Sequence, residues 1–223
     1  MRAAAVALGL ALLAPGAGAG AQEFVTLREP LSDLDFYRAV ACAAEPGGPC
    51  RKPFLRWPED RRGALTAGLV STPDALPPDH AAPFDAALDA AIAAVNGAGS
   101  EIGLARDDAA PDIAVHVVST PPGGVIEGTG VAALDGFELP FARVALRTRD
   151  GVIGEAVIAV SVFAAAGDAR SVLLEEVVQA LGLMTDVAGP AYARSIFAEE
   201  ANAAVTLDGQ DAAALRLHYP EEG

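Results

Sequence analysis

The feature that most constrains the fold of this chain is a short amphipathic segment, EEVVQALGL, at residues 175–183. On a helical wheel the leucine and valine side chains fall on one arc, whereas Glu175, Glu176 and Gln179 fall on the opposite arc. Taken alone, this pattern indicates a helix that packs through its apolar arc and keeps its polar arc in water. The order of the elements around it instead predicts that the polar arc faces a cleft beside the sheet. Gly182 is typical of the left-handed residue after a helix, so the chain is expected to turn sharply there.

The patterns around this segment predict an α+β domain with a twisted mixed sheet. Phe84, Leu88 and Ile92 recur every four residues, which predicts a long helix over residues 84–95 that backs the sheet. Runs rich in β-branched residues predict strands. The expected strands are residues 64–70, 100–104, 111–118, 143–147 and 155–162, and the polar segment belongs to a helix over residues 172–181.

The N-terminus predicts a signal peptide over residues 1–21. Arg2 supplies a positive charge, residues 3–14 are apolar, and the small residues before Gln22 suit cleavage. The apolar run is too short to span a membrane, and no cysteine directly follows it to carry a lipid anchor. We therefore expect the mature protein in the periplasm or outside the cell, without a membrane anchor.

The two cysteines, Cys42 and Cys50, flank a turn rich in proline and glycine, CAAEPGGPC. In an exported protein, a pair this close is expected to form a disulfide. Residues 22–55 then form an irregular N-terminal extension stapled by this bond, and residues 56–223 form the main domain.

The charge balance excludes several classes of partner. The chain has 30 acidic and 15 basic residues, so its net charge at pH 7 is −15. Such a surface repels nucleic-acid phosphates and anionic lipids. His80, His116 and His218 have no second histidine at ligand spacing, so the sequence offers no standard zinc site.

The segments after the polar helix resemble those of the metzincin metallopeptidases, and of the matrixins most closely. GLMTD follows the helix, Arg-Ser-Ile-Phe occupies residues 194–197, and TLDGQDAAALRLHYP occupies residues 206–220. In metzincins the zinc-binding helix runs into Leu-Gly-Leu, a Ser-Ile-Met turn underlies the metal, and a final helix ends in Leu-Tyr. The resemblance covers roughly residues 57–220. It implies a metzincin-like zincin domain whose edge strand lines a cleft and pairs with extended peptides.

The resemblance places the family's site on residues that cannot bind zinc in the family's way. Its two helical histidine ligands fall on Glu175 and Gln179, its catalytic glutamate on Glu176, its glycine on Gly182, and its third ligand on Thr185, which Asp186 follows. Its methionine turn falls on Ser195, Ile196 and Phe197, with phenylalanine in place of methionine. The chain is also similar to an uncharacterised family of exported bacterial proteins that carry EExxQALGL.

These residues lead to two functional hypotheses. Zinc is not expected, and no cofactor is required, although the oxygen atoms of these side chains suit a hard cation such as Ca²⁺. The first hypothesis is an exported pseudopeptidase that binds a peptide or protein partner in the cleft. The alternative is a hydrolase that uses Glu176 as a general base, with an unusual metal or with none.

Export and disulfide formation are tested together by mass spectrometry of the mature protein. We expect an N-terminus near Gln22 and a peptide pair linked through Cys42 and Cys50, because an exported chain is both processed and oxidised. An intact Met1 together with two free thiols would contradict the exported assignment.

Overall fold

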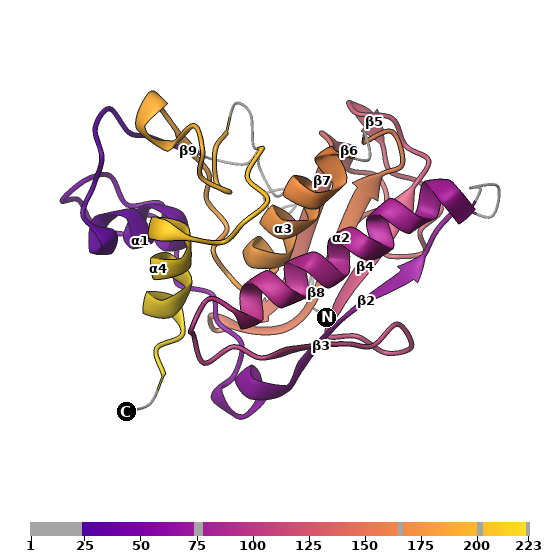
Figure 1. Cartoon of the computed structure of the whole chain (residues 1–223), viewed down its shortest axis with the longest axis horizontal. Coiled ribbons are helices and arrows are strands. Elements are labelled where there is room, and N and C mark those ends of the chain that lie inside the picture. The colour runs from indigo at the N-terminus through magenta and orange to yellow at the C-terminus, as the bar shows by residue number, and fades with distance from the viewer. Residues whose placement is uncertain (1–23, 74–77, 165–166, 200–202, 222–223) are drawn as a thin grey trace, which may run out of the picture.

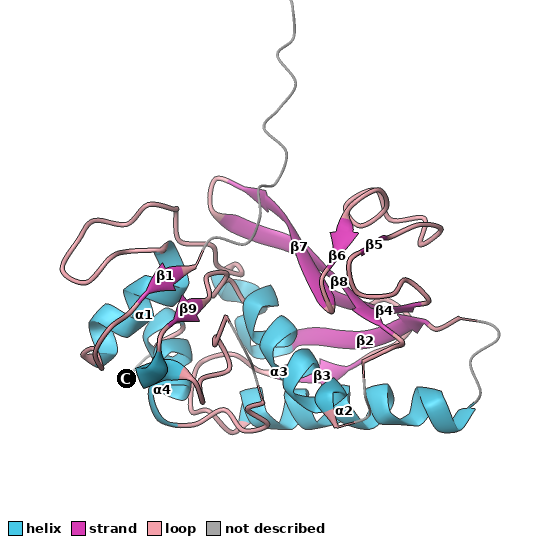
Figure 2. Cartoon of the chain, turned by 90° about the horizontal axis from the view of Figure 1, so that it is seen from above, coloured by secondary structure: helices cyan, strands magenta, loops and turns pink. Residues whose placement is uncertain are grey.

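The chain folds as a mixed sheet with helices on one face and a small two-stranded sheet on the other, as Figures 1 and 2 show. This computed structural model describes residues 24–73, 78–164, 167–199 and 203–221. The signal peptide expected over residues 1–21 lies outside the described residues. The predicted α+β class is confirmed: several helices accompany a sheet that is mostly parallel.

The main sheet has five strands in the order β3-β2-β4-β8-β7. Strands β2, β3, β4 and β8 run parallel to their neighbours, whereas β7 is antiparallel to β8 and forms one edge. The bounds are β2 Leu65–Ser71, β3 Leu104–Arg106, β4 Ile113–Val118, β7 Ala142–Arg149 and β8 Val152–Ser161. Asp150 and Gly151 both have positive φ and make the tight turn of the β7–β8 hairpin.

Four of the five strands lie where the sequence predicts them, but the short strand expected over residues 100–104 is wrong. Strand β3 begins only at Leu104, and the residues before it form the connection from the preceding helix. The backbone of Gly103 passes so close to Gly63 that an added Cβ would lie 2.8 Å from the Gly63 carbonyl oxygen. The Asn96 side chain then fixes the start of β3 through hydrogen bonds to Leu104 N and O.

Two helices cover one face of the sheet. They are α2, Pro78–Asn96, and α3, Asp168–Ala180, which lie side by side in Figure 1. Helix α2 contains the helix expected over residues 84–95, and α3 begins four residues before the helix expected over residues 172–181 and ends one residue before its predicted end. Their apolar side chains join those of the strands in one large hydrophobic core, which includes Leu88, Ile158 and Val177.

The sequence predicts an irregular N-terminal extension, and this is wrong. The extension contains helix α1, Asp33–Cys42. Ser32 caps this helix by accepting a hydrogen bond from Asp35 N, and Phe36 and Val40 are fully buried in the large core. The prolines of the extension flank the helix and do not enter it. Helix α1 packs on the C-terminal helix α4, Gly209–His218, at one end of the molecule (Figure 1).

A smaller lobe covers part of the other face of the sheet. It contains strands β5, Gly124–Val125, and β6, Glu138–Leu139, which pair antiparallel. Ile126, Leu134 and Leu139 of this lobe are fully buried against Val157 and Ala159 of β8. Strands β1, Val25–Thr26, and β9, Val187–Ala188, form a separate parallel pair. Short 3-10 helices, η1 at Glu59–Ala64 and η2 at Pro190–Tyr192, complete the fold.

The predicted disulfide between Cys42 and Cys50 is present and closes the loop after α1. In the part of the chain that the structure describes, no helix is long and apolar enough to cross a membrane.

The C-terminal end of α3 is capped by residues that come from distant parts of the chain. The last carbonyl groups of a helix have no partner within it. Trp57 Nε1 donates to Ala180 O at 3.0 Å, and Tyr219 Oη donates to Leu181 O at 2.6 Å. Gly182 follows with a φ of 103°, and its α-carbon faces the carbonyl of Leu55. The helix therefore ends where the glycine predicts, and the turn is held from both sides.

Replacing Gly182 by alanine is expected to lower the free energy of unfolding by more than about 3 kcal/mol. The positive φ strains any L side chain by about 1–3 kcal/mol, and a Cβ would lie 1.9 Å from Leu55 O. Gly128→Ala is the matched control, because Gly128 also has a positive φ but nothing within 4 Å of a Cβ. Urea denaturation of both variants should show a far larger loss for Gly182→Ala; equal losses would contradict the close packing.

Candidate functional site

The polar arc of α3 is buried, whereas its amphipathic pattern taken alone indicates an arc in water. Glu176 is 5% exposed, Gln179 is fully buried, and Glu175 is half-buried. The chain after Gly182 returns over this side of the helix, and Thr185 and Asp186 are buried with it. The fold thus brings together five of the residues that the sequence singled out, inside the protein.

Gln179 links the two carboxylates on either side of it. Its Nε2 donates to Asp186 Oδ1 at 2.9 Å and lies 3.4 Å from Glu175 Oε1. A carboxamide nitrogen has two N–H donors, so these two contacts occupy both of them. Gln179 therefore holds the turn after the helix against the helix itself.

Glu176 is a buried acid with a buried carboxyl oxygen that is not hydrogen-bonded. Its Oε2 has no partner among the described residues. Burial raises the pKa of Glu176 well above its ordinary value, and the nearby charges of Glu175 and Asp186 raise it further, while Arg143 opposes them. Both effects favour the protonated, neutral form of this carboxyl group.

Asp186 is the second acid whose ionisation is suppressed. Burial and the charge of Glu199 raise its pKa to about 7, while the hydrogen bond from Gln179 and the charge of Lys52 act in the opposite direction. The neighbouring Thr185 is tied through its backbone N–H to Val40 O at 3.0 Å, and its hydroxyl has no partner among the described residues. Helix α1 therefore holds this turn through a backbone hydrogen bond.

The Ser195-Ile196-Phe197 turn is buried and is held by an acid that the sequence analysis missed. Asp211 of α4 accepts hydrogen bonds from Ser195 Oγ at 2.7 Å and from Ile196 N at 2.9 Å. The Phe197 ring packs edge-on against Phe36 at 6.1 Å. The sequence offered one signal for Asp211, because it is an acid that directly precedes three alanines in the last helix. Arg143 and Lys52, whose charges reach Glu176 and Asp186, had no such signal.

The residues of this site do not fit a zinc ion. His80 lies on α2, His116 bonds to Ser71, and His218 bonds to Tyr37 and Leu55, so each imidazole is engaged or placed elsewhere. Across the described ranges, no group of three or more His, Cys, Asp or Glu side chains could hold a metal. The N–H groups of Gln179 lie between two carboxylates, where a cation would have to sit, so Ca²⁺ gains no support either.

The pH dependence of stability tests the buried state of Asp186. An unfolded aspartate ionises near 3.8, whereas the folded group keeps its proton until about pH 7. Its contribution to stability is therefore full below pH 4 and is lost as the pH rises to 7. We expect Asp186→Asn to gain stability relative to the wild type over this range, by up to about 4 kcal/mol. Urea titrations of both proteins at pH 4 and 8 measure this; a constant difference would contradict it.

Comparison with known families gives one match. A family described as a protein of unknown function, DUF2927, matches residues 35–222. This match does not tie the chain to the metzincins. A comparison with curated proteins finds no match. The matched region runs from α1 to beyond α4 and includes the disulfide and the whole candidate site. The chain therefore belongs to the DUF2927 family, whose function is unknown.

Proposed function

We propose that this protein is an exported, pseudopeptidase-like domain that binds an extended peptide or a protein segment along the edge of its sheet. The metzincin resemblance supports this proposal through the order of the elements. A backing helix, an edge strand, a polar helix that ends at Gly182, a Ser-Ile-Phe turn and a final helix follow one another as the resemblance implies.

The observation that carries the proposal is the open edge of β7. Ser161 N donates to Phe141 O, and the hydrogen-bonded pairs of an antiparallel ladder alternate from there. The backbone groups of Arg143, Ala145 and Arg147 thus face β8, and those of Ala142, Val144 and Leu146 face outward. Among the described residues, no backbone group bonds to this outer side. Such an edge can accept one more strand.

The buried acids favour binding over catalysis. A general base must be ionised and must reach the proton that it removes. Glu176 is buried away from any substrate, and its raised pKa disfavours the ionised form that a base requires. Gln179 uses its N–H groups on Glu175 and Asp186 and has none left to stabilise an oxyanion. Helix α3, which carries these residues, packs against β7.

The alternative function is a hydrolase that uses Glu176, and one observation favours it. A carboxyl group with a raised pKa and an unpaired buried oxygen is the form in which enzymes hold a general acid or base near neutral pH. This alternative requires the chain over Glu176 to open and admit water.

Glu176→Gln separates the two functions, because it keeps the shape of the side chain and removes its ability to ionise. On the binding proposal the purified wild type carries well below one equivalent of zinc and cleaves no member of a mixed peptide library. The variant should then fold normally and behave the same. If the wild type cleaves a peptide and the variant loses at least the roughly 10²–10⁴-fold that a positioned base supplies, the enzyme reading replaces ours.

Peptide binding by strand addition is tested with N-methylated peptides. Peptides are first selected from a random library on the immobilised protein. Methylating every second amide nitrogen, either at the odd or at the even positions, should lower the affinity at least tenfold for one of these two sets. Methylation of the other parity should be tolerated, since only every second N–H of an added strand faces β7. Equal sensitivity at both parities, or failure to select any peptide, would contradict strand addition.

A further inference from the structure

The basic residues of this acidic protein are concentrated beside the edge strand. Residues 51–56 and 142–161 contain 6 of the 15 basic residues and only 2 of the 30 acidic ones. The rest of the chain has 9 basic and 28 acidic residues. The two segments are distant in sequence, so their proximity in space is a property of the fold.

The fold joins these two segments at the tip of the β7–β8 hairpin. Arg56 pairs with Val152 as a parallel bridge. Arg56 N donates to Gly151 O at 3.0 Å, and Ile153 N donates to Arg56 O at 2.8 Å. The basic segment at 51–56 therefore lies against the hairpin and adds its positive charge to that of the arginines on β7.

Three arginines follow one another along β7. Arg143 and Arg147 lie on the same face of the strand, with one residue of that face between them, and Arg149 follows at the tip. The Arg143 guanidinium lies over the Phe137 ring at 4.5 Å, which orients it. The side chains of Arg147 and Arg149 are 72% and 94% exposed.

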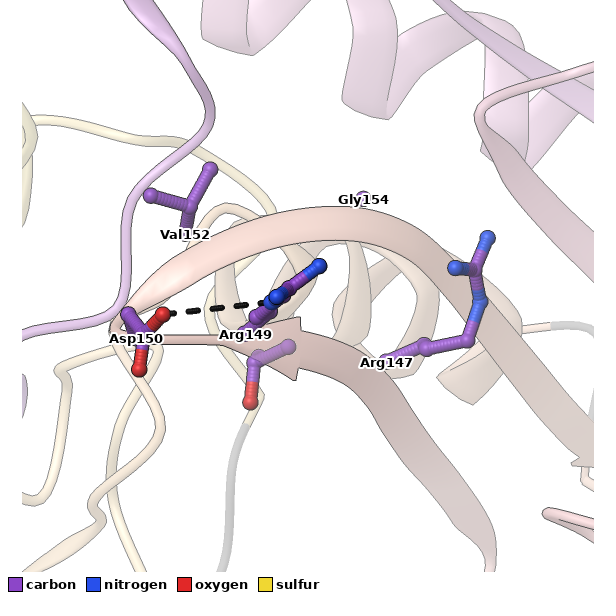
Figure 3. A pocket seen from close by; sticks show the side chains of 6 residues that line it. Arg147, Arg149, Asp150, Val152 and Gly154 are labelled. Carbon is purple, nitrogen blue, oxygen red and sulfur yellow. Dashed lines mark ion pairs between the residues drawn. The ribbon is translucent and has the colours of Figure 1, made fainter.

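The last two arginines line a shallow pocket with Val152 and Gly154, shown in Figure 3. Arg147 Nε donates a hydrogen bond to Glu155 at 2.8 Å. Among the described residues nothing bonds to the two terminal nitrogens of Arg147, so these can bind a ligand. Asp150 approaches Arg149 only to 3.9 Å and is itself exposed. Glu155 therefore engages only one nitrogen of Arg147, and Asp150 makes no hydrogen bond to Arg149.

A glycine keeps the floor of this pocket open. Arg147 pairs with Glu155 and Thr148 pairs with Ile153, so Gly154 is an extra residue in β8 and forms a bulge. A Cβ at Gly154 would lie 3.8 Å from Arg147 Nη1, in ordinary contact.

We propose that the segment that pairs with β7 is acidic at alternate positions, and this inference rests on the proposed function. In an added strand every second side chain lies on the face of Arg143 and Arg147. Carboxylates there form cross-strand pairs with guanidinium groups, which can bind them through two parallel hydrogen bonds. The other side chains lie beside Val144 and Leu146, which are half-buried apolar residues, and are therefore apolar.

A second copy of this chain is not the expected occupant. Two β7 strands that pair with each other would bring the arginines of one copy beside those of the other, and like charges across strands are unfavourable. Charged residues on an edge strand do commonly prevent self-association. Acidic residues would serve that purpose equally in a chain this rich in acids. Three arginines, the side chain best matched to carboxylates, are explained by an acidic ligand.

The inference is tested with two short peptides, acetyl-Gly-Glu-Val-Glu-Val-Glu-Gly-amide and its Gln counterpart, titrated against the full mature protein by fluorescence anisotropy at low salt. We expect the Glu peptide to bind at least tenfold more tightly. The double variant Arg147→Gln/Arg149→Gln should remove most of this preference. The control Arg28→Gln/Arg194→Gln removes the same charge at two exposed arginines without a hydrogen bond or ion pair in the described chain, and should preserve it.

The outcomes separate this inference from the proposed function on which it rests. Equal binding of the two peptides that N-methylation of one parity abolishes would overturn the acidic preference and leave strand addition in place. A Glu preference that the control variant loses equally would also overturn it, because it would reflect overall charge. Absence of binding by both peptides at millimolar concentration, with self-association of the Arg147→Gln/Arg149→Gln variant, would overturn both and identify the arginines as guards against edge pairing.

Discussion

The capped end of α3 is the interaction on which the rest of this structure depends. The helix ends in the middle of the protein, and its last carbonyls would be costly to bury without partners. Trp57 from the start of the domain and Tyr219 from its end satisfy those of Ala180 and Leu181. Gly182 can follow only because it has no side chain where Leu55 passes. Three remote parts of the chain must meet before this helix is complete, so the capped end joins the extension, the sheet and α4 into one structure.

The sharp turn at Gly182 also determines the chemistry of the site. It directs the chain back over the polar arc of α3 and buries Glu176 and Asp186. Two ionised carboxylates in this place would be strongly unfavourable, and the protein reduces that cost in two ways. Gln179 donates an N–H group to Asp186, and the raised pKa values of Glu176 and Asp186 favour their protonated forms. These residues thus form a buried polar cluster within the fold whose acids are held toward their protonated forms.

The sequence predicts those features that depend on local periodicity. Helices α2 and α3 and strands β2, β4, β7 and β8 follow from the spacing of apolar residues. Helix α1 was missed because the prolines around it obscured its pattern, although Ser32 and Phe36 carry its cap and its core contact. A helical wheel alone places Gln179 in water, because it cannot show that a segment from later in the chain covers the polar side of the helix. The contact of Asp211 with Ser195 joins residues whose pairing has no local signature.

The edge strand is suited to binding because both ends of its hairpin are fixed. At the tip, Arg56 pairs with β8 and joins the hairpin to the extension. At the other end, the lobe of Ile126 and Leu139 packs on Val157 and Ala159. Between these anchors, β7 is held along its whole length by β8 on one side, while its outward backbone groups keep the geometry that an added strand needs. Only the incoming peptide would then lose conformational entropy on binding, because the strand that receives it is already ordered. The disulfide beside α1 and the capped end of α3 contribute to this rigidity, because both hold the segment from which Arg56 reaches the hairpin.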